Sequence, residues 1–343
     1  MPTLYVTEPG AVVRRSKGSI VVTIDKDPDG PGPLRKKRRE LAEVEPHLLE
    51  LIALVGRSHI TSWATHLCLQ QGIAVAWFRR NGDFLGRLVP ELSRTADLRL
   101  AQFHAVTDDA RALHLARMFI ASKVRSAIAV LSVIRSNRPG KPELGQAMRA
   151  LQAMTGAVQN TTEKDALLGF EGNAARIYFE VFRVGFVGGI LFTGRARRPP
   201  PDPANALLSF GYVILVNAVA SLLEARGFDP YLGFLHTVRS GRPSLALDLT
   251  EEFRHSVVDR FALRVFNRRQ LRPEHFEADE SRGGVKLTRE GMRSFFRAWE
   301  EFMDKPLPGL ADDISPEALM RRQADRLAAH IRGREEYLPV FPG

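Results

Sequence analysis

Short runs of β-branched and other apolar residues alternate with turn signals over the first ninety residues of the chain. The expected strands cover residues 4–6, 12–13, 20–24, 73–79 and 83–89. Asn81-Gly82 lies between the last two, and this dipeptide favours a tight hairpin turn. Residues 61–71 have the pattern of a short helix that ends at Gly72. The pattern therefore predicts a small β-rich domain over residues 1–92.

The spacing of apolar residues becomes helical after Pro90. The expected helices cover residues 93–136, 142–155, 203–226, 244–266, 288–303 and 316–332, and another begins after Thr162 and includes Phe182. Asp202 is expected to cap the helix that Pro203 begins. That helix is apolar nearly all round, which is typical of a buried central helix. We predict an α+β protein in which a larger all-α domain, residues 93–343, follows the β-rich domain.

Charge and composition narrow the classes of function. Lys and Arg exceed Asp and Glu by 49 to 39, and a net charge of +10 favours a polyanionic partner, with nucleic acid first. A solvated basic surface without a specific partner is the alternative. The single cysteine, Cys68, excludes an internal disulfide and favours a reducing compartment, so we expect the cytoplasm. We expect no signal peptide and no membrane span.

One histidine is followed by acidic residues at short spacing. His236 precedes a basic turn, and Asp248, Glu251 and Glu252 come next, at helical spacing that would place them on one face with residue 255. Carboxylates so close repel unless a positive charge separates them. Either a divalent cation or nearby arginines would provide that charge. The alternative is an acidic first turn that the helix dipole favours.

Glu171 lies in a segment whose other residues favour burial, so its carboxylate needs a partner. A salt bridge to Arg176 is one interpretation, and a metal ion is the other. One histidine with carboxylates suits Mg²⁺ or Mn²⁺, and the imidazole favours Mn²⁺. The sequence has no cysteine cluster for zinc, no Walker loop and no GxSxG or GxGxxG motif. Tyr178, the tyrosine near Glu171, is expected to pack in the core rather than act as a nucleophile.

Four segments resemble motifs of the CRISPR-associated adaptation nuclease, the integrase subunit that inserts new spacers into CRISPR arrays. They are LGFEGNAARIYF (168–179), RPPPDPANALLSFGY (198–212), GFDPYLGFLH (227–236) and PSLALDLTEEFR (243–254). Residues 4–10 and 285–291 also look like family segments. The resemblance covers nearly the whole chain and follows the order of the family's motifs.

This resemblance assigns roles to particular residues. It implies that Glu171, His236 and Glu251 are catalytic metal ligands and that Asp248 supports them from outside the ligand set. Arg239 and Arg254 match basic residues near DNA, and Arg242 in the same basic turn is expected to join them. His255 stands where the family has proline, so the acidic helix is expected to bend differently here.

The resemblance also implies a reaction and an assembly. The expected enzyme is a metal-dependent DNA endonuclease and integrase that joins foreign DNA to the CRISPR array when a 3′-hydroxyl attacks a phosphodiester. The N-terminal domain would form a homodimer. A dimer of a small companion adaptation protein would bridge two homodimers on double-stranded DNA with 3′ overhangs and on CRISPR repeat DNA. The alternatives are a branched-DNA repair nuclease and a DNA-binding scaffold without catalysis.

Overall fold

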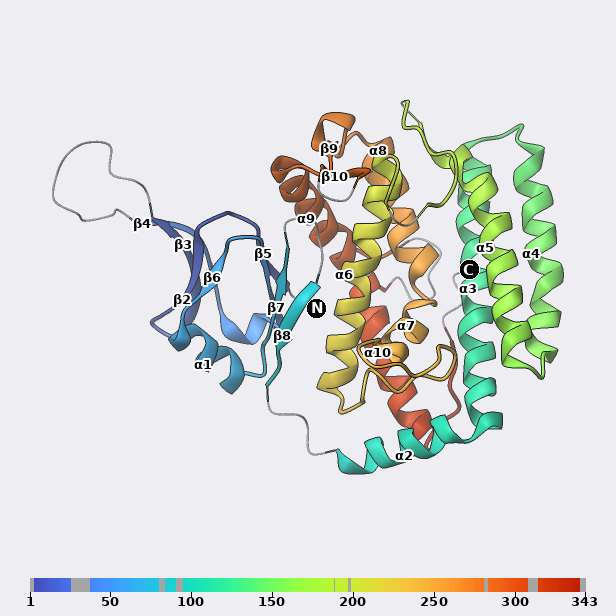
Figure 1. Cartoon of the computed structure of the whole chain (residues 1–343), viewed down its shortest axis with the longest axis horizontal. Helices are drawn as coiled ribbons and strands as arrows, with labels where there is room; N and C mark the ends of the chain where they lie inside the picture. The colour runs from blue at the N-terminus through green and yellow to red at the C-terminus, as the bar shows by residue number, and fades with distance from the viewer. Residues whose placement is uncertain are drawn as a thin grey trace. The chain divides into compact units, whose positions relative to one another are not determined.

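The chain forms two compact units, Met1–Leu92 and Ser93–Gly343 (Figure 1). The structure is a computed structural model that describes residues 3–25, 38–79, 84–90, 95–187, 189–196, 199–280, 283–307 and 314–339. The first unit is rich in β-strands and the second is mostly helical. The predicted α+β fold class is therefore confirmed.

Two four-stranded sheets build the N-terminal unit. One has the order β1 (Thr3–Val6), β5 (Leu51–Val55), β7 (Ala74–Phe78), β8 (Phe84–Leu88). The other has the order β4 (Arg38–Val44), β3 (Ser19–Asp25), β2 (Ala11–Ser16), β6 (His59–Ile60). β7 and β8 pair in antiparallel register, as a hairpin requires, and the predicted turn residues Asn81-Gly82 lie outside the described residues.

The core of this unit includes Cys68. Helix α1 (Ser62–Gln70) buries Cys68 fully against Ile73 and Val75, which confirms its predicted packing role. Burial raises the pKa of the Cys68 thiol to about 11. The thiol is therefore protonated at neutral pH, and it is not an activated nucleophile.

The C-terminal unit is a helical bundle with one small sheet. Its helices are α2 (Ala96–Thr107), α3 (Asp109–Asn137), α4 (Pro142–Asn160), α5 (Lys164–Phe182), α6 (Pro203–Ala225), α7 (Ser244–Thr250), α8 (Arg260–Asn267), α9 (Arg289–Asp304) and α10 (Pro316–Ile331). Strands β9 (Phe276–Ala278) and β10 (Val285–Leu287) form an antiparallel pair that the sequence pattern did not predict. Helices α3, α4 and α5 lie side by side, and α6 runs through the middle of the unit (Figure 1).

Two of the predicted helices are interrupted. The expected helix over 93–136 breaks at Asp108, whose carboxylate accepts hydrogen bonds from the N–H groups of Ala110 and Arg111 and so caps α3. The expected helix over 244–266 also breaks. α7 ends at Thr250, and one stretch of π-helix, Arg254–Asp259, precedes α8.

The central helix α6 begins as predicted, with the Asp202 side chain accepting from the Asn205 N–H and Pro203 in the first turn. By length and composition alone α6 could cross a membrane, but two thirds of its most apolar window, 67%, is buried within the unit. It packs closely on the π-helical stretch. A Cβ atom added at Gly211 would lie 2.8 Å from Val258 Cγ1, so glycine permits this close approach.

We therefore expect Gly211→Ala to lower the free energy of unfolding by about 1–3 kcal/mol, because the added methyl overpacks the contact with Val258. Chemical denaturation followed by circular dichroism measures this change. Gly156→Ala on α4 is the matched control: a Cβ added there would meet no atom within 4 Å, so the better helix propensity of alanine should stabilise the protein by up to about 1 kcal/mol. Equal stability of Gly211→Ala and wild type would contradict the close packing.

Candidate active site

Two of the predicted ligands meet at a lysine that the sequence motifs did not single out. Glu171 lies on α5, Glu251 follows α7, and Lys123 lies in the middle of α3. The Lys123 Nζ contacts Glu171 Oε1 and also lies 2.7 Å from Glu251 Oε2. The side chains of Lys123 and Glu251 are 4% exposed, and that of Glu171 is 23% exposed. One buried ammonium therefore bridges two carboxylates from different segments.

Arg254 supplies a second positive charge beside Glu251. Its Nε lies 3.3 Å from Glu251 Oε2, and its guanidinium lies over the Tyr212 ring, 4.7 Å from the centroid. Burial by itself would raise the pKa of Glu251, but the charges of Arg254 and Lys123 outweigh it and lower the pKa to about 2. The Glu251 carboxylate is therefore ionised at neutral pH.

The loop that carries His236 is anchored by Asp248. The Asp248 carboxylate is fully buried and accepts hydrogen bonds from the backbone N–H groups of Phe234, Leu235 and His236 at 2.6, 2.9 and 3.0 Å. Its Oδ1 also lies 2.6 Å from His236 Nδ1. A neutral imidazole that donates from Nδ1 has a free lone pair on Nε2, the arrangement that metal-ligating histidines adopt.

The donor types of this site fit a divalent cation. Glu251 Oε2 is buried between two cationic groups and accepts no well-aligned hydrogen bond among the described residues. Two carboxylates and one imidazole are typical ligands of Mn²⁺ or Mg²⁺. However, no three His, Cys, Asp or Glu side chains converge at metal-binding distance within the described parts of the chain. Instead, Lys123 lies between the two carboxylates.

The predicted acidic face does not form, because α7 ends before Glu251. Its four residues point to four different partners. Asp248 binds the His236 loop, Glu251 binds Lys123, Glu252 accepts from the Tyr337 hydroxyl, and His255 Nδ1 lies 2.6 Å from Asp259 Oδ2. The expected repulsion is therefore avoided by separation as well as by positive charge.

Glu252 connects this turn to the segment that follows α10. Gln323 on α10 donates through Nε2 to Glu252 Oε2 at 3.1 Å and to the Tyr337 hydroxyl at 3.2 Å. Tyr337 is fully buried, and its ring contacts Phe119 edge-on. The segment after α10 is therefore hydrogen-bonded to Glu252, the residue next to Glu251.

The alternative salt bridge from Glu171 to Arg176 is wrong. Arg176 pairs with Glu180 four residues further along α5, and both side chains are exposed. Tyr178 is fully buried with its ring 4.1 Å from that of His255, which agrees with the predicted packing role. A sequence signal for the true partner was present: Lys123 is a lone lysine among apolar positions of α3, a pattern that requires a buried counter-charge.

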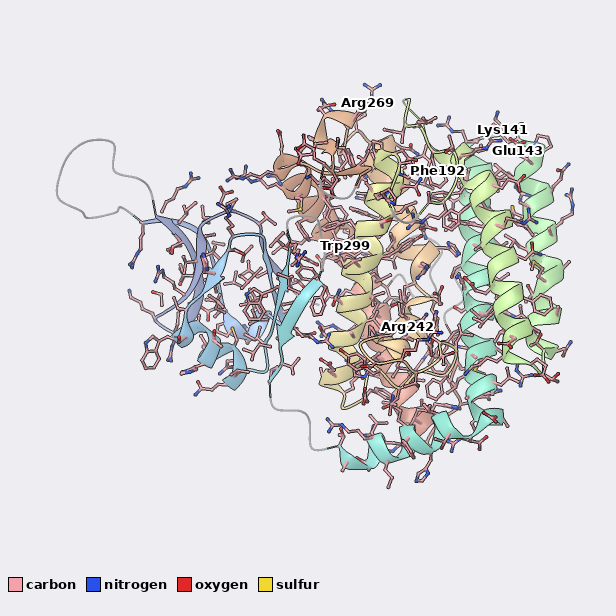
Figure 2. All side chains as sticks on the ribbon, in the orientation of Figure 1. Lys141, Glu143, Phe192, Arg242, Arg269 and Trp299 are labelled. Atoms are coloured by element: carbon pink, nitrogen blue, oxygen red, sulfur yellow. The ribbon has the colours of Figure 1, made fainter. Side chains whose placement is uncertain are left out.

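The three predicted DNA-contacting arginines have different surroundings. Arg239 is exposed, in the loop that precedes α7. Arg242, in the same loop, is half-buried (Figure 2). Arg254 differs because only 15% of its side chain is exposed and it contacts Glu251 and Tyr212. Tyr212, the last residue of the 198–212 motif, was given no role in the sequence analysis. Its hydroxyl donates to Asp259 while its ring lies beneath Arg254, so it contacts both ends of the π-helical stretch.

Residues 4–301 match the family described as CRISPR associated protein Cas1. The CRISPR-associated endonuclease Cas1 3 of Thermus thermophilus is 33% identical over 96% of this chain and 94% of its own length. A casposase bound to integration product has a TM-score of 0.83 and 20% identity, covering 99% of this chain and 93% of that one. A chain of a Cas6-RT-Cas1–Cas2 complex has a TM-score of 0.79 and 22% identity, covering 99% of this chain and 36% of that one.

The structural likenesses define the class of fold, which CRISPR-associated proteins share with a casposase. The sequence match over most of the chain then identifies the family. The chain belongs to the CRISPR associated protein Cas1 family, whose similar curated members are named endonucleases. The family expected from the four sequence motifs is confirmed.

We expect Asp248→Asn to lower the free energy of unfolding by about 3 kcal/mol or more, because an amide cannot accept from all the donors that face Asp248. His236→Ala should cost about 1 kcal/mol or less, because that side chain is partly exposed. Urea denaturation of the two variants in EDTA compares them. Equal stabilities would show that Asp248 does not anchor the loop.

Acid unfolding should depend on Glu251. In the folded protein the pKa of Glu251 lies below the ordinary glutamate value of 4.5. The ionised carboxylate therefore stabilises the fold above about pH 4.5, and this stabilisation is lost as the pH falls towards 2. Glu251→Gln should be about 3–5 kcal/mol less stable at pH 7, because two buried cations lose their partner, and should lose less stability between pH 4.5 and 2. Denaturation curves at several pH values measure both effects. Glu180→Gln, which changes an exposed carboxylate, should follow wild type.

Proposed function

We propose that this protein is a metal-dependent DNA endonuclease and integrase that inserts new spacers from foreign DNA into a CRISPR array. The observation that supports this most is the pairing of Glu171 and Glu251 with one buried ammonium, together with a histidine that Asp248 orients. Family membership agrees with phosphodiester chemistry, because the similar curated members are named endonucleases. The reaction acts on cellular DNA, so we place it in the cytoplasm.

Glu171, Glu251 and His236 through Nε2 would hold Mg²⁺ or Mn²⁺. Such a cation, when bound, stabilises negative charge on the phosphoryl oxygens and on the leaving oxygen. Arg239 and Arg242 would contact DNA phosphates and fix the position of the strand. Arg254 would keep Glu251 ionised and correctly oriented, and its contact with DNA stays a prediction.

The chemical step needs no covalent protein intermediate. A 3′-hydroxyl oxygen of the incoming DNA forms a bond to phosphorus in the target strand, and the bond from phosphorus to the target's 3′ oxygen breaks. The attacking hydroxyl loses a proton and the leaving oxygen gains one, so the number of phosphodiester bonds stays constant. ATP is not required, in agreement with a sequence that lacks a Walker loop.

The proposed substrates are double-stranded DNA with 3′ overhangs and CRISPR repeat DNA. The proposed assembly contains two homodimers, formed through the N-terminal units and bridged by a dimer of a small companion adaptation protein. The casposase whose fold this chain shares was solved with an integration product, and another neighbour belongs to a Cas1–Cas2 complex. The net charge of +10 suits a partner rich in phosphate.

One observation favours a second candidate, a DNA-binding scaffold without catalysis. Lys123, Arg254, Glu171 and Glu251 form an ion-pair cluster that balances its own charges. Such a cluster would hold the bundle together without any metal. A branched-DNA repair nuclease would use the same residues as the integrase, and only the reaction products separate those two.

We expect Glu171→Gln to reduce strand joining by at least about a hundredfold while DNA affinity stays within about threefold of wild type, because Glu171 would hold the cation rather than contact the DNA. The assay combines labelled duplex DNA with 3′-hydroxyl ends, the companion protein, a plasmid that carries a CRISPR array, and Mn²⁺. Donors with 3′-dideoxy ends, and reactions in EDTA, should give no joined product.

Arg239→Glu is the contrasting variant, since it should weaken DNA binding and joining together. Cleavage of branched DNA without joining would favour the repair nuclease. DNA binding by wild type without any cleavage or joining would favour the scaffold. Full activity of Glu171→Gln, or activity in EDTA, would overturn the proposed metal site.

A further inference from the structure

Lys123 lies at a buried position of α3, where a charged side chain is energetically unfavourable. It is in the middle of α3, and its helix neighbours Ile120, Ser122 and Val124 are almost completely buried. A buried ammonium without partners would cost several kcal/mol. Glu171 and Glu251 provide the compensation, so the two carboxylates and the lysine form one interdependent unit.

The same two carboxylates are the proposed metal ligands. A divalent cation binds carboxylate oxygens at about 2.0–2.1 Å when it is Mg²⁺. The Lys123 Nζ already lies 2.7 Å from Glu251 Oε2 and in contact with Glu171 Oε1. A metal ion on these two oxygens would occupy nearly the same position as the ammonium, and two cations so close repel strongly. The site therefore holds either the lysine or the metal ion.

The two positive groups beside Glu251, Arg254 and Lys123, differ in how easily each can move away from the carboxylate. Arg254 is fixed by its position over the Tyr212 ring and by the fold of the π-helical stretch. Lys123 has a flexible four-carbon stem, and its ammonium is held by the two carboxylates. Glu171 is the more exposed of these carboxylates, at 23% against 4% for Glu251, so solvent reaches the ion pair from the Glu171 side.

We propose that Lys123 is an internal competitor for the metal ion: it occupies the cation position and holds Glu171 and Glu251 together until the metal displaces it. This inference rests on the proposed metal site and adds a positioning residue to it. Two consequences follow. The metal-free protein is folded and stable, and metal affinity is lower than the ligands alone would give, because binding must break two ion pairs.

The first test measures Mn²⁺ affinity by isothermal titration calorimetry, and melting temperature in EDTA and in Mn²⁺. Lys123→Met should bind Mn²⁺ at least about tenfold more tightly than wild type, because the competing charge is gone. It should melt at a lower temperature in EDTA and gain more from Mn²⁺ than wild type does. Lys123→Arg keeps the charge and should show no gain in affinity. Arg135→Met, an exposed cation on the same helix, controls for net charge.

Unchanged or weaker Mn²⁺ binding by Lys123→Met would overturn the competition. If neither wild type nor Lys123→Met shows Mn²⁺ binding that Glu171→Gln abolishes, the proposed metal site itself is wrong. The two failures are thus distinguished by whether wild type binds Mn²⁺ through Glu171.

A second test uses wild type alone and therefore does not depend on folding of a variant. Amine acylation followed by peptide mass spectrometry reports how accessible each lysine is. Lys123 should react slowly in EDTA and several-fold faster in saturating Mn²⁺, whereas the exposed Lys141 (Figure 2) should react equally in both. Equal protection of Lys123 in EDTA and Mn²⁺, with Mn²⁺ bound, would show that the lysine is not displaced.

Discussion

The buried ion pairs of Lys123 join the segments that carry the candidate active site. α3 supplies the ammonium, α5 supplies Glu171, and the turn after α7 supplies Glu251. Each of these groups would be costly to bury without an opposite charge, so the ammonium stabilises both carboxylates in their positions. The packing of three separate chain segments and the electrostatics of the site therefore have the same cause.

The break after Thr250 determines how the remaining polar groups are used. A continuous helix would have placed Asp248, Glu251 and residue 255 on one face. Because the backbone turns and then widens into a π-helix, each side chain faces its own partner. π-Helical turns are common at functional sites. Glu251 and Glu252 lie in the turn just before this one, and they face the candidate site and the core separately.

Local signals in the sequence predicted much of the fold and the candidate ligands. The alternation of strands and turns, and the cap at Asp202, are properties of neighbouring residues, and the structure agrees with them. The family motifs singled out Glu171, His236 and Glu251. The partner of Glu171 could not be read in the same way, because Lys123 lies on another helix and Arg176 lay closer in sequence. A different bend was expected because of His255, but the end of α7 at Thr250 was not predicted, because the contacts that stabilise the turn come from α3 and from the segment after α10.

The bond between Tyr337 and Glu252 has a consequence for synthesis of the protein. Glu252 is made 85 residues before Tyr337, so the ribosome must add all of α8, α9 and α10 before the hydroxyl that completes its hydrogen bonds exists. A nascent chain that ends before Tyr337 therefore contains the turn of Glu251 without this hydrogen bond. A premature stop codon just before Tyr337, even one that spares α10, removes that hydrogen bond. The hydrogen bonds of the turn at the candidate site are thus completed only in a chain that has been translated past α10.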